Sequence, residues 1–336
     1  YRTIRTCPSI NLADYEIDSL NPGEIHLAQE KRSGRKVAMK IFNPQKKEDL
    51  DFFYSALNAT LLDFPGILKP IGYCFPLTTK ESDSPDQNSY IIVTEYMKNG
   101  TLEDFNKRYH KHKHSRKNKP TIRSKIIFGI PAIMKKVHKR NIIHRDLRPQ
   151  NIFLDSNFEP QIGNFSCSAF AGYIREESIV GAFTYIPPEV LTNEESCWTS
   201  TDVYSYAIVL YQMFAKELIY EDGSKRQKTL EILRAAMEGM RYVKPANIPE
   251  HYWELIQRCW APNSDDRPTF EEITEILKDD KYALREEGEV NMDELHEYQQ
   301  RIDSCNINEG DLSKMKTSQQ RIDSCNINEG DLSKMK

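Results

Sequence analysis

Three side chains suited to phosphoryl transfer lie close together near the middle of the chain. The segment His144–Asn151 reads HRDLRPQN and contains Asp146, Arg148 and Asn151. A carboxylate accepts the proton of an attacking hydroxyl, a cation lies beside the transferred phosphate, and an amide oxygen binds magnesium. These residue types predict a catalytic loop with Asp146 as the base, Arg148 at the phosphate and Asn151 at the metal.

This segment resembles the catalytic loop of protein kinases. In that family the next motif is Asp-Phe-Gly, whose aspartate holds magnesium, whereas this chain reads Asn164-Phe165-Ser166. Magnesium prefers charged oxygen ligands, and the Asn164 amide offers one neutral oxygen. The resemblance therefore implies a degraded metal site made of Asn151 and Asn164, with Mg²⁺ binding in doubt.

A lysine lies within an apolar strand near the start of the chain. The run VAMKIF belongs to a predicted strand, Lys36–Phe42, in which Val37, Ala38 and Ile41 surround the stem of Lys40. A lysine in such a setting needs an anionic partner. The resemblance makes Lys40 the residue that binds the α- and β-phosphates of ATP; the alternative is a strand-edge lysine that reaches water.

The acid that should position this lysine is missing from its expected place. Kinases carry a glutamate in the following helix, and the resemblance puts Ser55 at that position. Serine has no charge, and Glu48, Asp49 and Asp51 lie one to two helical turns upstream. Unless one of these acids substitutes, Lys40 has lost its positioning partner.

The loop expected to cover the phosphates has lost two of three glycines. Asp18 and Leu20 occupy the first two positions, and Gly23 remains, two residues before Ile25. Glycine lets backbone N–H groups approach phosphates closely, whereas leucine adds bulk and aspartate adds negative charge. The alternative is a plain hairpin with a turn at Asn21-Pro22-Gly23.

The segment Tyr90–Leu102, YIIVTEYMKNGTL, predicts a buried strand that leads into a glycine turn. It resembles the kinase hinge, with Thr94 controlling pocket depth and the backbone of Glu95–Met97 available to adenine. The implied cofactor is ATP, bound weakly. The residues expected to bind it are Gly23, Ile25, Ala38, Lys40, Thr94, Glu95, Met97 and Phe153.

The resemblance covers about residues 14–279 and implies an α+β, two-lobed fold. A small β-rich lobe is expected at 14–97 and a larger, mainly helical lobe at 98–279. Asp202 would cap the catalytic loop, and Arg267 would pair with Glu189. The pairs Cys259-Trp260 and Arg267-Pro268 are similar to those of tyrosine-kinase-like and tyrosine kinases.

A threonine that touches the catalytic aspartate in Ser/Thr kinases is replaced by Ala182. Residues 280–336 are expected to form a polar, weakly helical tail, in which the 18 residues 299–316 recur unchanged at 319–336. A solvated insertion is predicted at 77–89. The basic run 107–119 is interpreted as a solvated face, with binding of an anionic partner as the alternative.

Bulk properties agree with an ordinary globular protein. The chain has 336 residues, 39% of them hydrophobic, and a net charge of −4. These values argue against nucleic acid as a partner, and the sequence lacks an apolar run long enough to span a membrane. With seven cysteines and no CxxC pair, free thiols in the cytoplasm or nucleus are expected.

The favoured hypothesis is a pseudokinase, a kinase fold with weak or absent phosphoryl transfer that serves as a binding or scaffold module for a protein partner. The alternative is a slow ATP-dependent Ser/Thr kinase acting on a protein substrate, because Asp146 is retained and Arg148 keeps a positive charge. A third hypothesis is a switch that binds ATP without Mg²⁺ and does no chemistry.

Overall fold

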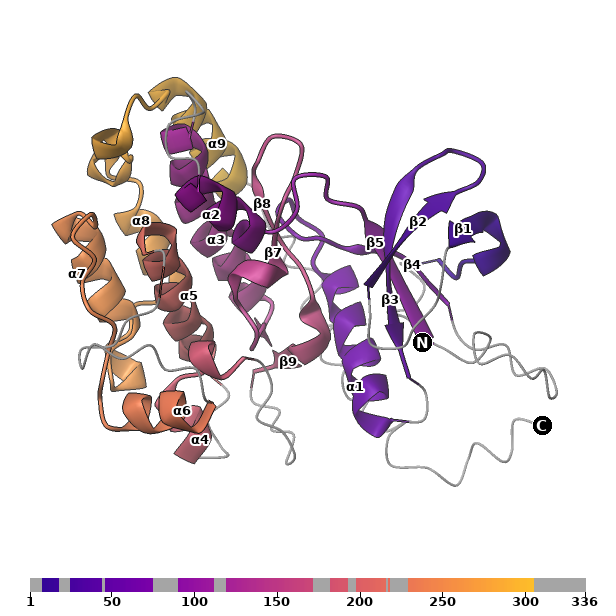
Figure 1. Cartoon of the computed structure of the whole chain (residues 1–336), viewed down its shortest axis with the longest axis horizontal. Coiled ribbons are helices and arrows are strands. Elements are labelled where there is room, and N and C mark those ends of the chain that lie inside the picture. The colour runs from indigo at the N-terminus through magenta and orange to yellow at the C-terminus, as the bar shows by residue number, and fades with distance from the viewer. Residues whose placement is uncertain are drawn as a thin grey trace. The chain divides into compact units, whose positions relative to one another are not determined.

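A computed structural model describes residues 8–17, 25–43, 46–74, 90–111, 119–171, 182–192, 198–215, 217 and 229–304 (Figure 1). The described residues fall into two compact units. One contains those of Tyr1–Asp63 and Lys69–Glu95, and the other those of Phe64–Leu68 and Tyr96–Cys305.

The first unit is built on a five-stranded antiparallel sheet in the order β1-β2-β3-β5-β4. Its elements are η2 (Leu12–Asp14), β1 (Tyr15–Ile17), β2 (Ile25–Glu30), β3 (Lys36–Phe42), α1 (Lys47–Ala56), η3 (Leu57–Leu61), β4 (Pro70–Cys74) and β5 (Tyr90–Glu95). Gly34 closes the β2–β3 hairpin with a φ of 69°, a left-handed conformation that glycine adopts without steric cost.

Alternation along the strands gives this sheet two different faces. One face carries a buried cluster that includes Met39, Ile41 and Val93. On the other face, α1 packs Phe53 edge-on against Phe42 with the ring centroids 5.6 Å apart. Helix α1 therefore covers the part of this second face around Phe42.

The second unit is mainly helical. Its helices are α2 (Leu102–Lys111), α3 (Lys119–Lys139), α4 (Pro188–Thr192), α5 (Thr199–Phe214), α6 (Thr229–Met237), α7 (Glu250–Cys259), α8 (Phe270–Ile276) and α9 (Met292–Ser304). Nearly every residue of α5 is buried, as expected for a helix that is apolar on all sides. The α+β fold, with a β-rich part and a mainly helical part, is confirmed.

Short strands and turns connect these helices. The strand β6 (Ile142–Ile143) pairs with β9 (Ala169–Phe170), and β7 (Ile152–Leu154) pairs with β8 (Pro160–Ile162). Single 3₁₀ turns are η5 (Pro149–Asn151), η6 (Phe165–Cys167), η7 (Phe183–Tyr185), η8 (Ser264–Asp266), η9 (Asp280–Tyr282) and η10 (Arg285–Glu287).

The predicted bridge between Arg267 and Glu189 is confirmed. The guanidinium forms two hydrogen bonds with the carboxylate, Nη1 to Oε1 at 2.5 Å and Nη2 to Oε2 at 2.9 Å. The Arg267 side chain is fully buried. Such a fork-on-fork pair fixes α4 to the segment after η8.

Residues 280–304 differ from the polar, weakly helical tail that was expected. They include α9, whose Leu295, Tyr298 and Ile302 are buried, and α9 packs against α3 (Figure 1). The three apolar residues share one side of the helix because they are three and four positions apart. The duplicated segment from residue 305 onward, the insertion, and 112–118 of the basic run lie outside the described residues.

Within the described part of the chain, no helix is both long enough and apolar enough to cross a bilayer.

Candidate functional site

Asp202, in the first turn of α5, holds the backbone of the catalytic loop. It accepts hydrogen bonds from the N–H groups of His144 at 2.8 Å and Arg145 at 2.9 Å. Arg145 needs this support because its φ of 62° is left-handed, which costs free energy for a residue with a Cβ. The predicted capping role of Asp202 is confirmed.

The charge of Asp202 is maintained despite complete burial. Burial by itself would raise the pKa of this carboxyl, but hydrogen bonds and charge from His138, together with His144, outweigh that effect and lower the pKa. The His138 Nε2 lies 2.9 Å from the Asp202 Oδ2. The loop is therefore anchored on an ionised carboxylate, which makes stronger hydrogen bonds than a neutral acid.

His144 connects the loop to the segment that carries Asn164. Its Nδ1 accepts the N–H of Asp146 at 3.2 Å, and its Nε2 lies 2.9 Å from the Gly163 carbonyl oxygen. A ring nitrogen that accepts an N–H carries no proton, so the proton is on Nε2 and is donated to Gly163. The imidazole also meets the Phe165 ring edge-on at 4.8 Å.

Asp146, the predicted base, is buried and has partners on both carboxylate oxygens. Its Oδ2 accepts from the Asn151 Nδ2 at 2.7 Å, and its Oδ1 accepts from the Ala182 N–H at 3.2 Å. The half-exposed Arg148 places Nε 3.4 Å from the same Oδ1. Ala182 therefore touches the aspartate through its backbone, although it lacks the hydroxyl of the threonine that it replaces.

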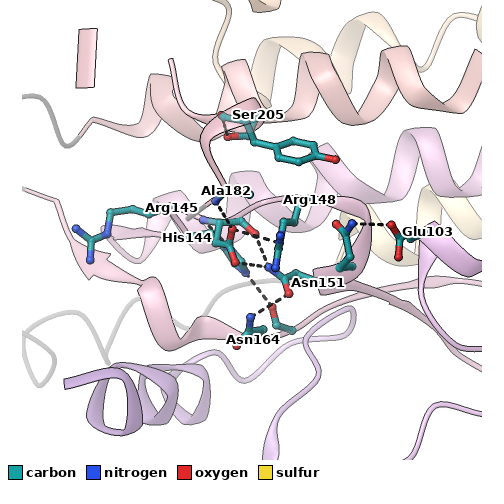
Figure 2. A network of polar contacts seen from close by, with 12 residues as sticks. Glu103, His144, Arg145, Arg148, Asn151, Asn164, Ala182 and Ser205 are labelled. Carbon is teal, nitrogen blue, oxygen red and sulfur yellow. Dashed lines mark hydrogen bonds and ion pairs between the residues drawn. The ribbon is translucent and has the colours of Figure 1, made fainter. Parts of the chain in front are cut away.

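The amides of Asn151 and Asn164 are hydrogen-bonded to each other (Figure 2). The Asn151 Nδ2 donates to the carbonyl oxygen and to Oδ2 of Asp146, both at 2.7 Å. Because Nδ2 faces two acceptors, the Oδ1 of Asn151 must point the other way, where it accepts the Asn164 Nδ2 at 2.9 Å. The orientation of both amides follows from the donor and acceptor inventory.

Asn164 has a left-handed backbone, with φ 58° and ψ 56°. Asparagine tolerates this conformation better than most residues. The preceding Gly163 donates its N–H to the Asn151 carbonyl oxygen at 2.9 Å. A Cβ on Gly163 would lie 2.9 Å from the ring of Phe153, so close packing against Phe153 requires glycine here.

The predicted nucleotide-binding residues of the first unit share one face of its sheet. Ile25 lies opposite Lys40, Leu27 opposite Ala38, and Ala38 opposite Thr94. Directly opposed residues of antiparallel strands point to the same face. Ile25 is 64% exposed and Leu27 is 49% exposed, so this part of the face is an open apolar surface.

Helix α1 contains Ser55, the position at which the resemblance expects a glutamate. Ser55 is buried on α1 and brings no charge. Asp49 accepts the Asn43 N–H at 2.8 Å, and Glu48 is exposed. Asp51 lies four residues before Ser55 and therefore on the same side of the helix, which makes it the best placed of the upstream acids.

The predicted site residues fall into two sets, one in each compact unit. The first unit contains Ile25, Ala38, Lys40, Thr94 and Glu95, and the second contains Met97, Asp146, Arg148, Asn151, Phe153 and Asn164. Gly23, Asp18 and Leu20 lie outside the described residues, as does 172–181.

Three contacts of the site were missed from the sequence. The first two are those of His138 with Asp202 and of the Ala182 N–H with Asp146. The third is a hydrogen bond of 2.8 Å from Gln150 to Glu103. Each joins residues far apart in the chain, and Ala182 contributes only its backbone N–H, so the side-chain pattern carried no signal for them.

Sequence comparisons find relatives of this chain among protein kinases. A probable serine/threonine-protein kinase of Dictyostelium discoideum is 28% identical over 277 residues, which cover 80% of this chain and 20% of that protein. Serine/threonine-protein kinase STY17 of Arabidopsis thaliana is 31% identical over 268 residues, covering 78% of this chain and 42% of that kinase. Tyrosine-protein kinase TXK of Homo sapiens is 27% identical over 279 residues, covering 78% and 47%.

The chain thus spans between about a fifth and a half of the length of these relatives. The family model for protein tyrosine and serine/threonine kinases matches residues 15–277, which is more than three quarters of the chain. This match contains the catalytic loop, Asp202, Arg267 and both faces of the sheet described above. The chain belongs to the protein tyrosine and serine/threonine kinase family.

Proposed function

We propose that this member of the family is a pseudokinase, which transfers phosphate slowly or not at all and serves as a binding or scaffold module for a protein partner. One observation carries the proposal. The Asn164 Nδ2 donates a hydrogen bond to the Asn151 Oδ1, the oxygen that the catalytic loop would otherwise offer to a magnesium ion.

An aspartate at position 164 would place one acceptor opposite another, an arrangement that a cation between them stabilises. Asparagine supplies an N–H instead, and the two side chains satisfy each other without a cation. The hydrogen bond therefore occupies the direction in which a metal ligand would point. A Mg²⁺ ion at this place would have to break the bond and would gain only neutral oxygens.

The donor set does not fit Mg²⁺ for a second reason. Asp146 is the nearby carboxylate, and both of its oxygens are engaged, by Asn151 and by Ala182. Among the residues that the structure describes, no three His, Cys, Asp or Glu side chains gather as a metal site. We therefore derive no step of catalysis through magnesium.

The expected effect on rate is large. Loss of one electrostatic contact to the transition state commonly lowers kcat about 10²–10³-fold, which is about 2.7–4 kcal/mol. Ser55 adds a second defect, because it cannot pair with Lys40 as a glutamate would. The effects of residues that act as a unit are not additive. We therefore expect the combined loss in rate to exceed either single loss but to be smaller than the two losses multiplied together.

A slow Ser/Thr protein kinase is the alternative, and specific observations favour it. Asp146 is held in place by the loop, Arg148 keeps a cation 3.4 Å from it, and several relatives are named serine/threonine kinases. Under this alternative the protein uses ATP, and its substrate is a protein hydroxyl.

A phosphoryl-transfer assay separates the two functions. The full chain is incubated with radiolabelled ATP, Mg²⁺ and a generic protein acceptor, next to an Asp146→Ala variant that lacks the base. We expect the two proteins to give the same background signal. Transfer by the parent that disappears in the Asp146→Ala variant would establish the kinase and overturn the pseudokinase.

Thermal unfolding with ATP, with and without Mg²⁺, completes the test. We expect any stabilisation by ATP to be independent of Mg²⁺. We also expect that introducing Asn164→Asp and Ser55→Glu together raises the transfer rate, because the first change supplies a charged metal ligand and the second supplies an acid where the family carries a glutamate.

A further inference from the structure

The segment that follows the family match supplies partners for the polar side chains of α3. Glu287 of η10 forms an ion pair with Arg123, and Glu294 of α9 accepts from Lys125 at 2.8 Å. Both cations are almost fully buried. A buried charge without a partner is strongly unfavourable, so the residues after 277 are part of what makes α3 stable in this position.

The same pattern continues along α3. Asp303 pairs with Lys135, and the Ile302 carbonyl oxygen accepts from Lys136. The Asn291 N–H donates to the Thr121 Oγ1 at 2.9 Å. Polar groups on α3 are therefore bonded to this segment from the first turn of α3 to its last.

Helix α9 also forms an ion pair with the β7–β8 hairpin. The Arg301 Nη2 lies 2.6 Å from Oε1 and 2.7 Å from Oε2 of Glu159, the residue immediately before β8. Glu159 is buried, and the Lys125 Nζ lies 3.7 Å from its Oε1. The hydrogen bonds to Glu159 raise the pKa of Arg301. Arg301 thus binds a buried acid of the hairpin from the solvent side.

A second contact of α9 lies next to this pair. The Tyr298 hydroxyl is packed so closely against Gly129 that a Cβ on Gly129 would lie 2.1 Å from its oxygen and 2.6 Å from the Pro160 Cγ. Gly129, Pro160 and Tyr298 therefore converge at the first residue of β8. Tyr298 of α9 therefore lies close to the start of β8, next to the Arg301–Glu159 pair.

The hairpin joins the two amides of the site. Strand β7 begins immediately after Asn151, and β8 ends two residues before Asn164. Ile152 lies opposite Ile162, and the Gly163 N–H donates to the Asn151 carbonyl oxygen. A shift of β8 along β7 would therefore move Asn164 relative to Asn151.

We propose that α9 is a positioning strap for the site, in which Arg301, acting through Glu159, holds β8 so that Asn164 meets Asn151. Arg301 and Glu159 are positioning residues and touch neither amide. This role does not depend on the proposed function, because α9 would hold β8 in the same way in an active kinase and in a pseudokinase.

Hydrogen exchange of the full-length chain, followed by mass spectrometry, tests the proposal. Arg301→Gln removes the charge, Arg301→Lys keeps the charge without the planar guanidinium, and Arg285→Gln is the matched control. Arg285 lies in the same segment on the surface, 3.5 Å from Asp280. The readout is the peptide 159–166, and the peptide 201–214 of α5 is the internal reference.

We expect amides in 159–166 to exchange about tenfold faster in Arg301→Gln, less fast in Arg301→Lys, and at the parent rate in Arg285→Gln, with 201–214 unchanged. Equally faster exchange in 201–214 would mean that Arg301 stabilises the whole unit and not β8 in particular. Unchanged exchange in 159–166 would mean that Arg301 does not hold β8. Either result overturns the proposal. If Arg301→Gln does not fold, Glu159→Gln removes the same pair and is judged by the same two peptides.

Because exchange requires neither ATP nor an acceptor, failure here is distinguishable from failure of the proposed function.

Discussion

Replacing Asn164 with aspartate changes the partner of the Asn151 Oδ1 from a donor to an acceptor. The parent hydrogen bond of 2.9 Å contributes about 0.5–1.5 kcal/mol. The buried Asn151 cannot turn away, because its Nδ2 is held by Asp146, and leaving its oxygen without a donor costs about 1–3 kcal/mol more. We therefore expect Asn164→Asp to lower the free energy of unfolding by about 1.5–4.5 kcal/mol in the presence of a chelator.

Binding of Mg²⁺ should restore much of the free energy of unfolding that the Asn164→Asp variant has lost. A carboxylate and an amide oxygen facing each other are suitable ligands for the ion, and a site at a hundredfold excess of ligand over Kd gains about 2.7 kcal/mol. With about 2–4 °C in Tm per kcal/mol for a domain of this size, the Tm of the variant falls by roughly 3–18 °C in a chelator. Saturating Mg²⁺ then raises it by about 5–10 °C.

The assay is thermal unfolding of both proteins across a titration of MgCl₂, starting in EDTA. Asn157→Asp is the control, because it adds the same charge at an exposed position in the turn of the same hairpin. We expect the parent and this control to show no saturable response. The reasoning is refuted if the parent gains as much from Mg²⁺ as Asn164→Asp does, or if Asn164→Asp does not respond.

Three other predictions concern stability. Arg267→Ala leaves Glu189 without its partner and should cost about 3–5 kcal/mol in urea-induced unfolding; a cost under about 1 kcal/mol would show that the pair is not buried in solution. A chain ended after Asp279 loses Glu287, the acidic partner of buried Arg123, and should show no cooperative unfolding transition by circular dichroism, whereas one ended after Ser304 should. Because the folded-state pKa of Asp202 is lowered, its contribution is present above its ordinary pKa of 3.8 and is lost as the pH falls below it. Asp202→Asn should therefore have a lower free energy of unfolding than the parent near neutral pH and should lose less of it in acid. An equal loss in parent and variant as the pH falls would contradict this.

Much of the fold was predictable from local patterns. The strand Lys36–Phe42 was predicted with the bounds that β3 has. The neighbours given to Lys40 were partly wrong, because Val37 and Ile41 lie in the cluster on the opposite face of the sheet and successive residues of a strand point to opposite faces. The contacts of Asp202 with the catalytic loop and of Arg267 with Glu189 were implied by the resemblance to protein kinases. Short-range periodicity predicts the strands and helices because it depends on backbone geometry and not on distant neighbours.

Helix α9 could have been predicted from the sequence but was missed. Leu295, Tyr298 and Ile302 have helical spacing, but the kinase resemblance ended at 279 and the remainder was interpreted as a tail. The ion pairs that hold α9 could not be found in this way, since Arg301 and Glu159 are 142 positions apart. A single sequence does not state which of its charged residues will meet.

The sequence by itself determined that position 164 has no charge, and this alone was enough to question magnesium. Only the tertiary structure decided what the uncharged side chain does. Asp202 shapes the loop from 57 and 58 residues away, Asp146 turns the Asn151 amide, and the hairpin brings Asn164 to the oxygen that remains. An amide has one donor end and one acceptor end, and which end faces a neighbour depends on every other group around it.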